Sequence, residues 1–388
     1  MLTLIKNVEC YAPSPMGTVD ILIANNAIAC IDANIAINES LVDVIDGSGL
    51  IALPGLVDSL VHISGGGGEG GFHTRTPQMS LTEASLHGVT TVVGALGTDA
   101  TTRTLPDLLA KAKGLNIEGI SAYCYTGSYH LPARTITGSV TDDIALIDCM
   151  IGVGEVAIAD HRAAEPTVQA LAEVAAQART GGMISGKAGI VYIHTGDGKR
   201  QLSVLHDVVN ETDIPASQFY PTHINRNQSL LDAGITWTRA GGVIDMTTST
   251  NEQFIEEGEI PAAQAIAYCL SQGVPASQLS MSSDGNASLP VFNENGALVG
   301  LEVGKVESLF AAFKALVLEH NVSLKNAISV VSTTPASKLK LHHKGKIKVG
   351  CDADLVLCDK ASLDIVHVLA KGKQLVKDST AVVKGTFE

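Results

Sequence analysis

The sequence contains few aromatic residues, 4% of the chain, and few charged ones, 17%. It also has no basic stripe to offset a formal net charge of -14, so we expect neither a nucleic-acid partner nor an anionic membrane surface. No apolar run approaches the ~20 residues that span a bilayer. The first residues lack the basic and apolar regions of a signal peptide. We therefore expect a cytoplasmic protein.

Cysteine is present but shows no Cys-x-x-Cys spacing, and seven residues cannot pair completely. This pattern is typical of buried thiols in a reducing compartment. Lysines are scattered except for one cluster, which we interpret as a solvated face near a domain junction. Its members are Lys338, Lys340, Lys344, Lys346 and Lys348.

Hydrophobic residues make up 45% of the 388 positions, enough for a barrel with an accessory domain. Residues 18–31 alternate apolar and polar side chains around Asn25-Asn26, which predicts a β-hairpin. Short strand patterns return at 353–357, 365–368 and 374–376. We therefore predict a small β-sandwich domain built from both ends of the chain, residues 1–52 and 346–388.

The middle of the chain, residues 53–345, has eight apolar strand patterns. Helical patterns lie between most of them, including residues 105–115, 168–178, 202–209 and 262–270. This alternation predicts an α/β fold with a (β/α)8 TIM-type barrel. A doubly wound open sheet is the alternative, but no Gly-x-Gly-x-x-Gly opens the first βα unit. The eight strands are expected at 55–63, 91–96, 121–125, 156–159, 190–194, 219–224, 243–248 and 279–283.

Polar residues fall at or near the carboxyl ends of these strands, where barrels carry their chemistry. They are Asp58, His62, Glu155, His194, His223 and Asp284. A lone histidine in a barrel strand is more often a core residue than a ligand. Two on successive strands, with an acid after the last strand, favour a divalent transition metal bound by imidazole and carboxylate.

Several motifs carry a resemblance to a known family. The first is Pro54-Gly55-Leu56-Val57-Asp58-Ser59-Leu60-Val61-His62, and it is similar to the opening motif of the amidohydrolase superfamily. Further motifs follow along the chain, and together the set resembles the isoaspartyl dipeptidases. This resemblance extends over almost the whole chain. These are Gly65-Gly66-Gly67-Gly68-Glu69, Gly97-Thr98-Asp99, Thr126-Gly127-Ser128-Tyr129-His130, Asp160-His161-Arg162, Pro221-Thr222-His223-Ile224-Asn225-Arg226 and Ser282-Ser283-Asp284-Gly285.

The resemblance implies a two-metal site with one departure. His194 and His223 would hold the more buried β metal, and His62 and Asp284 the α metal. Glu155 stands where many members carry a bridging carbamylated lysine. Leu60 replaces the first histidine of the family motif and cannot bind a metal. We expect one firmly bound Zn²⁺ at the β site, with a second ion weak or absent.

The activity that the resemblance implies is hydrolysis of the isopeptide bond in β-aspartyl dipeptides by metal-bound hydroxide. Asp284 would shuttle the proton, and Tyr129 would donate to the oxyanion. Residues expected to bind the dipeptide are Glu69, Gly67, Thr98, Arg162, Arg226 and Ser288. The resemblance also implies a homo-oligomer.

Two other functions stay open at the level of the sequence. One is another amidohydrolase activity, such as that of a mononuclear enzyme similar to the D-aminoacylases, whose acylated substrates have no free ammonium for Glu69. The other is a catalytically impaired barrel that acts in binding or assembly, because Leu60 removes a ligand.

Overall fold

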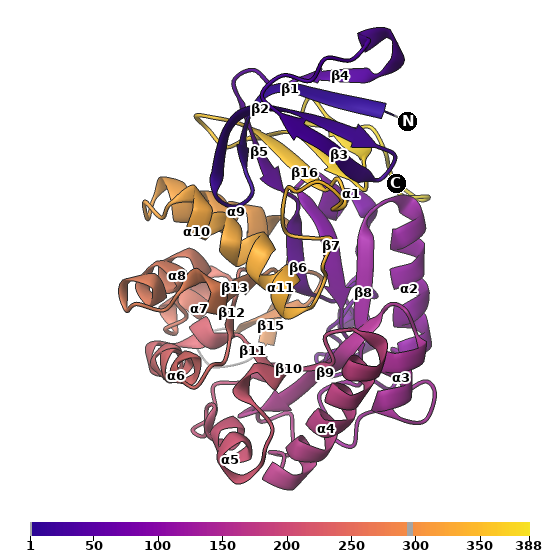
Figure 1. Cartoon of the computed structure of the whole chain (residues 1–388). Coiled ribbons are helices and arrows are strands. Elements are labelled where there is room, and N and C mark those ends of the chain that lie inside the picture. The colour runs from indigo at the N-terminus through magenta and orange to yellow at the C-terminus, as the bar shows by residue number, and fades with distance from the viewer. Residues whose placement is uncertain (1, 293–297) are drawn as a thin grey trace.

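The computed structural model describes residues 2–292 and 298–388 (Figure 1). Both ends of the chain enter one nine-stranded sheet at the top of Figure 1. Eight strands follow the order β19-β18-β17-β16-β5-β1-β2-β3, and β4 pairs with β1. Their bounds are β1 Leu2–Tyr11, β2 Pro15–Ala24, β3 Ala27–Asp32, β4 Asp43–Asp46, β5 Leu50–Pro54, β16 Leu355–Asp359, β17 Ile365–Ala370, β18 Lys373–Lys377 and β19 Thr380–Ala381.

The hairpin predicted around Asn25-Asn26 is confirmed, because β2 and β3 pair with Ala24 opposite Ala27. Strand β5 was not expected, and it joins the two ends of the chain by pairing antiparallel with β16. The sandwich form of this domain is not confirmed, since hydrogen bonds connect all nine strands in one sheet. Its own buried cluster includes Ile5, Ile21 and Leu357.

Eight parallel strands follow in the middle of the chain. Strands β6 to β11 form one sheet in chain order, and β12 pairs with β13. The ring continues through Asn225, whose side-chain amide bonds both backbone groups of Thr247 in β12. It closes where Asp284 N donates to Leu60 O and His62 N to Gly285 O. The bounds are β6 Leu56–Val61, β7 Val89–Gly94, β8 Ser121–Thr126, β9 Met150–Ile158, β10 Ile190–Thr195, β11 Phe219–Thr222, β12 Ile244–Thr247 and β13 Leu279–Ser282.

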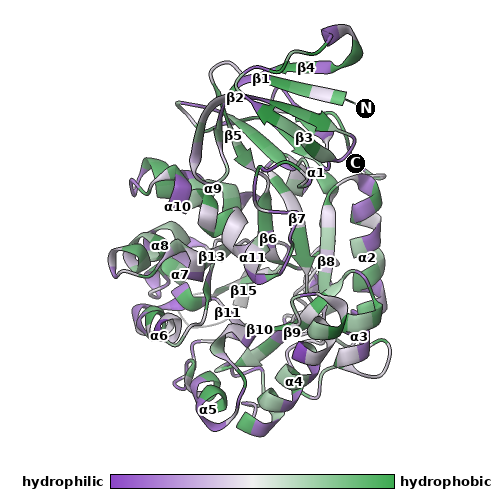
Figure 2. Cartoon of the chain, in the orientation of Figure 1, coloured by the Kyte–Doolittle hydropathy of each residue, from purple (hydrophilic) through white to green (hydrophobic). Residues whose placement is uncertain are grey.

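Helices cover the outside of this ring, with hydrophilic residues on exposed positions such as those of α2 (Figure 2). Many begin at a side chain that accepts a backbone N–H, as Thr104, Ser139 and Thr167 do. The α-helices are α1 Leu81–Ser85, α2 Leu105–Glu118, α3 Val140–Leu146, α4 Val168–Ser185, α5 Ser203–Glu211, α6 Gln228–Arg239, α7 Glu252–Glu256, α8 Ala262–Ser271, α9 Glu307–Leu318, α10 Leu324–Ile328 and α11 Thr334–Lys338. Short 3-10 turns lie at Glu39–Leu41, Phe72–Thr74, Ala216–Gln218, Ile224–Arg226 and Ala276–Gln278, with a π turn at Ser329–Thr333.

The α/β class is therefore confirmed, and the strand arrangement is consistent with the predicted (β/α)8 barrel. The barrel interior is filled by a buried cluster that includes Val57, Leu60 and Val93. Tyr125 and Tyr192 stack there with ring centroids 5.0 Å apart. The candidate ligands lie beyond this packed interior, toward the carboxyl ends of the strands. A hairpin follows β13 at that end, made of β14 Ser288–Phe292 and β15 Leu298–Val303.

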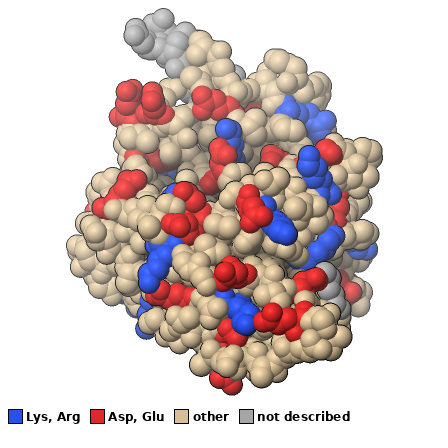
Figure 3. Space-filling view, turned by 90° about the horizontal axis from the view of Figure 1, so that it is seen from above, with Lys and Arg blue, Asp and Glu red and all other residues tan. Residues whose placement is uncertain are grey.

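The surface carries acidic and basic residues side by side on the face shown in Figure 3. One expectation about the lysine cluster was wrong. Lys344 is buried, and its Nζ lies 2.7 Å from Asp352 Oδ2 and 2.6 Å from Asp354 Oδ2. Among the described residues, no helix is both long and apolar enough to cross a membrane.

Candidate metal centre

Five predicted ligands come together at the carboxyl ends of five barrel strands. Glu155 lies in β9 and His194 in β10, while His62 follows β6 and His223 follows β11. Asp284 comes two residues after β13. Two of them leave their strands with unusual backbone angles, since His223 has φ 62° and Asp284 has φ 52°. These left-handed positions turn the chain at the mouth of the barrel.

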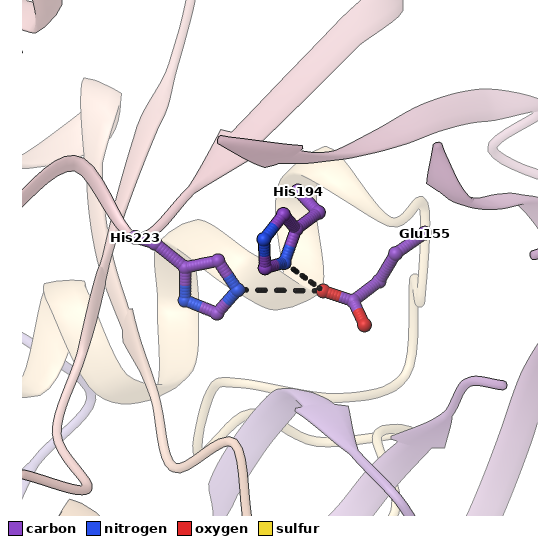
Figure 4. A group of neighbouring side chains, drawn as sticks. All are labelled: Glu155, His194 and His223. Atoms are coloured by element: carbon purple, nitrogen blue, oxygen red, sulfur yellow. Dashed lines mark ion pairs between the residues drawn. The ribbon is translucent and has the colours of Figure 1, made fainter. Parts of the chain in front are cut away.

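Glu155, His194 and His223 form the centre of the site (Figure 4). Oε1 of Glu155 lies 3.4 Å from His194 Nδ1 and 3.4 Å from His223 Nε2. All three side chains are buried. Their ligand atoms lie within 4.8 Å of one another, close enough to surround a single ion.

The chemistry of this group suits a divalent metal. Neither oxygen of Glu155 has a hydrogen-bond partner among the described residues, although the carboxylate is buried. Burial and the neighbouring His194 lower the pKa of His223 to about 4, so its imidazole is neutral and has a free lone pair. Burial opposes ionisation of Glu155, but the two histidines lower the pKa of its carboxyl well below its usual range. An unpaired carboxylate beside two imidazoles fits a zinc-type site.

His62 and Asp284 lie beside this group but form a pair of their own. Nε2 of His62 is 3.1 Å from Asp284 Oδ1 and 3.6 Å from Glu155 Oε2. Burial opposes protonation of His62, yet Asp284 and Glu155 raise its pKa to about 9. Leu60 is fully buried in the apolar interior of the barrel and offers no donor atom.

A second layer of residues holds His194. Its Nε2 lies 2.9 Å from Asp160 Oδ2, and its Nδ1 lies 2.8 Å from the hydroxyl of Tyr129. Burial and the charge of Glu155 raise the pKa of Tyr129 well above its usual value, so the phenol remains a donor. Sequence reasoning assigned no role to Asp160. The only available signal was its place two residues before Arg162, in a motif used for the resemblance.

Three of the residues predicted to bind substrate contact Glu69, and a fourth, Gly67, lies against one of these three. Thr98 Oγ1 donates to Glu69 Oε1 at 2.7 Å, and Ser288 Oγ donates to Oε2 at 3.3 Å. Nη1 of Arg162 is 3.5 Å from Glu69 Oε1. A Cβ built on Gly67 would lie 3.0 Å from that of Ser288, so a larger residue would crowd this cluster. The Glu69 carboxylate is therefore positioned by contacts with Thr98, Ser288 and Arg162.

Arg226 is placed differently from the other predicted substrate ligands. Its Nε donates to the carbonyl oxygen of Thr195, the residue after His194, at 2.9 Å. Within the described parts of the chain, the Arg226 guanidinium makes this one hydrogen bond and no ion pair. Its remaining donors are therefore available, and its charge lies near enough to His223 to help lower the pKa of that imidazole.

Arg103 is a further buried residue that sequence reasoning missed. Its guanidinium donates to the carbonyl oxygens of Ser64, Gly66 and Thr76, with the last two bonds at 3.0 and 2.9 Å. These bonds hold the glycine-rich turn that carries Glu69. No motif distinguishes this arginine from a surface residue, because its acceptors are all backbone atoms.

Comparison with known proteins agrees with this geometry. Residues 51–386 match the amidohydrolase family. The β-aspartyl dipeptidase of Fervidobacterium islandicum AW-1, solved in complex with β-Asp-Leu, is 42% identical over 98% of both chains, with a TM-score of 0.91. A second structure of a β-aspartyl dipeptidase from this organism is 40% identical over 98% of both chains, with a TM-score of 0.89. The dihydropyrimidinase of Brevibacillus agri NCHU1002 is 16% identical over 99% of this chain and 97% of its own, with a TM-score of 0.69, and shares the fold.

The chain belongs to the amidohydrolase family. It is an enzyme of that family, and its predicted resemblance to the isoaspartyl (β-aspartyl) dipeptidases is confirmed.

Proposed function

We propose that this enzyme hydrolyses the isopeptide bond of β-aspartyl dipeptides. The observation that carries the proposal is its 42% identity, over 98% of both chains, to a β-aspartyl dipeptidase solved with β-Asp-Leu. The arrangement of Glu69 and Arg162 supports it, because an acid and an arginine beside a metal centre match the ammonium and carboxylate groups of such a substrate.

We propose that Glu155, His194 and His223 hold one Zn²⁺ at the β site. His62 and Asp284 would hold a second ion weakly or not at all, since Leu60 supplies no ligand. A bound zinc ion supplies a Lewis acid that polarises the amide carbonyl and lowers the pKa of water. Glu155 is already a carboxylate, so this site needs no carbamylated lysine.

Asp284 is the proposed proton carrier. Its carboxylate faces the centre beside His62, and its backbone N–H is tied to Leu60 O, which fixes the turn at the end of β13. From this place Asp284 takes a proton from the attacking water and returns it to the leaving amine.

Tyr129 is the proposed donor to the oxyanion. Its hydroxyl lies 2.8 Å from Nδ1 of His194, the atom that would face the metal. Binding of the metal by His194 would leave the Tyr129 hydroxyl free for the substrate oxygen.

Recognition of the dipeptide rests on charge. Glu69 would bind the α-ammonium, and Arg162 or Arg226 a carboxylate. The resemblance implies that Thr98, Ser288 and Gly67 also bind the substrate. The contacts of the two hydroxyls support a narrower role, which is to hold Glu69 in place.

Another amidohydrolase activity is the main alternative, for instance on N-acylated amino acids. The test is hydrolysis of β-Asp-Leu and of its N-acetyl derivative, with the metal content measured on the same sample. We expect cleavage of β-Asp-Leu alone, with close to one zinc per chain. Preference for the acetylated compound would contradict the proposal. The domain division at residues 52 and 345, the cytoplasmic location and the homo-oligomer stay predictions.

A further inference from the structure

Asp160 contacts both a proposed metal ligand, His194, and a proposed substrate-binding residue, Arg162. Its Oδ2 lies 2.9 Å from His194 Nε2 and 2.7 Å from Arg162 Nη2. Its Oδ1 accepts from Arg162 Nε at 3.0 Å and from the backbone N–H of Arg162 at 2.8 Å. The carboxylate is 6% exposed, so these contacts are made away from bulk water.

Asp160, Arg162, Tyr129 and His194 form a closed ring of contacts. Arg162 lies over the ring of Tyr129, with Cζ 5.4 Å from the centroid. The hydroxyl of Tyr129 contacts His194, and His194 in turn contacts Asp160. The metal ligand and the substrate arginine are therefore oriented by one acid.

We propose that Asp160 is a positioning residue that fixes the tautomer of His194 and the direction of Arg162 at once. A carboxylate can only accept hydrogen bonds, so His194 must carry its hydrogen on Nε2. That leaves the lone pair on Nδ1, the atom 3.4 Å from Glu155 Oε1. The same carboxylate accepts hydrogen bonds from two nitrogens of the Arg162 guanidinium, which keeps this side chain directed into the site and away from solvent. The part concerning Arg162 rests on the proposed function.

The direct test is Asp160→Asn, compared with two other variants. Asparagine keeps the oxygen that accepts from Arg162 N but can present an NH₂ donor to His194 Nε2, which favours the wrong tautomer. Asp160→Ser also keeps an acceptor for that N–H, yet its side chain is too short to reach His194. Glu165→Gln is the matched control, because Glu165 accepts from Ala159 N in the same loop.

The first measurement is the Zn²⁺ dissociation constant of each apoprotein, by competition with a chromophoric chelator. We expect Asp160→Asn to weaken zinc binding by about 10–100-fold and Asp160→Ser to weaken it similarly, with Glu165→Gln like the wild type. Thermal unfolding of the apoproteins separates this loss from a general loss of structure. If Asp160→Asn does not fold, Asp160→Ser decides. Wild-type zinc affinity in the folded variants would overturn the proposal.

The second measurement is hydrolysis of β-Asp-Leu at a zinc concentration that saturates every variant. KM should rise in Asp160→Asn and not in Glu165→Gln, because only the former removes the oxygen that accepts from Arg162 Nη2. An unchanged KM would overturn the role toward Arg162. If the wild type did not cleave β-Asp-Leu, the proposed function would fail, while the zinc measurement would still decide the role of Asp160 toward His194.

Discussion

Glu69 and Arg162 form an ion pair, with Oε1 and Nη1 3.5 Å apart. Both side chains are partly exposed, at 38% and 34%. A zwitterionic dipeptide offers a cation for the first residue and an anion for the second. Binding would therefore replace one protein ion pair by two contacts with the substrate, and a ligand that lacks either charge would leave one partner unmatched.

The first prediction concerns Glu69→Gln. A bound dipeptide would cover Glu69, and removal of one partner of a charged hydrogen bond that is buried in a complex typically costs about 2–5 kcal/mol. We expect kcat/KM for β-Asp-Leu to fall by at least about 30-fold. The N-acetylated dipeptide is the control substrate, since it has no ammonium for Glu69. Equal losses on both substrates would show that Glu69 has another task.

The second prediction concerns Leu60→His. An imidazole at this position would stand close to His62 and Asp284, so we expect the zinc content to rise from one toward two ions per chain, with faster turnover. Without metal the variant should unfold more easily, because a polar ring enters an apolar cluster. Leu60→Met is the control, since a swap of similar volume costs less than about 1.5 kcal/mol. Elemental analysis and thermal unfolding with and without zinc check both points.

If Leu60→His binds no additional zinc, the barrel interior around this position is closed to a second ion. If it binds two ions with unchanged turnover, the second ion was never limiting for activity.

The third prediction concerns Glu155→Gln. The carboxylate lies between His194 and His223, and an amide is a far weaker ligand. We expect the purified variant to lose its zinc and its activity together. Glu69→Gln provides the comparison, because it removes a carboxylate from the site mouth and should keep its zinc. Wild-type zinc content in Glu155→Gln would contradict the proposed ligand set.

The fourth prediction concerns stability. Lys344 is buried between Asp352 and Asp354, and Asp354 O also accepts from Gly55 N at the start of the barrel. Lys344→Met removes the cation from the buried Asp354 and the half-buried Asp352, so the free energy of unfolding should fall by about 3–5 kcal/mol. Lys348→Met, at an exposed position of the same cluster, should change it little. Urea unfolding of both variants checks the difference.

This ion pair also predicts a pH effect. Burial opposes the charge on Lys344, but Asp354 and Asp352 outweigh it and raise the pKa above its usual value of 10.5. The folded state thus holds this proton more tightly than the unfolded chain. The stabilisation should be complete at neutral pH and be lost as the pH rises above the usual value, and Lys344→Met should abolish this part of the alkaline loss.

The sequence by itself determined the barrel, its strand positions and the set of polar residues at the strand ends. Few folds other than a barrel are compatible with apolar strand patterns that alternate with helical patterns. His194 and His223 stand at the ends of successive strands. The bounds were less certain, since β9 begins at Met150, several residues before the expected start. Its early residues Gly152 and Gly154 gave no strand signal, although both fit closely against β10.

The tertiary structure alone decided how polar side chains are paired. Asp160, Arg103 and Lys344 look like ordinary charged residues in the sequence, and each places its charged group here against partners that no sequence pattern indicates. Such pairings depend on which loops meet at the mouth and base of the barrel. Hydrophobic periodicity specifies that strands are buried, but it carries no information on which buried donor meets which acceptor.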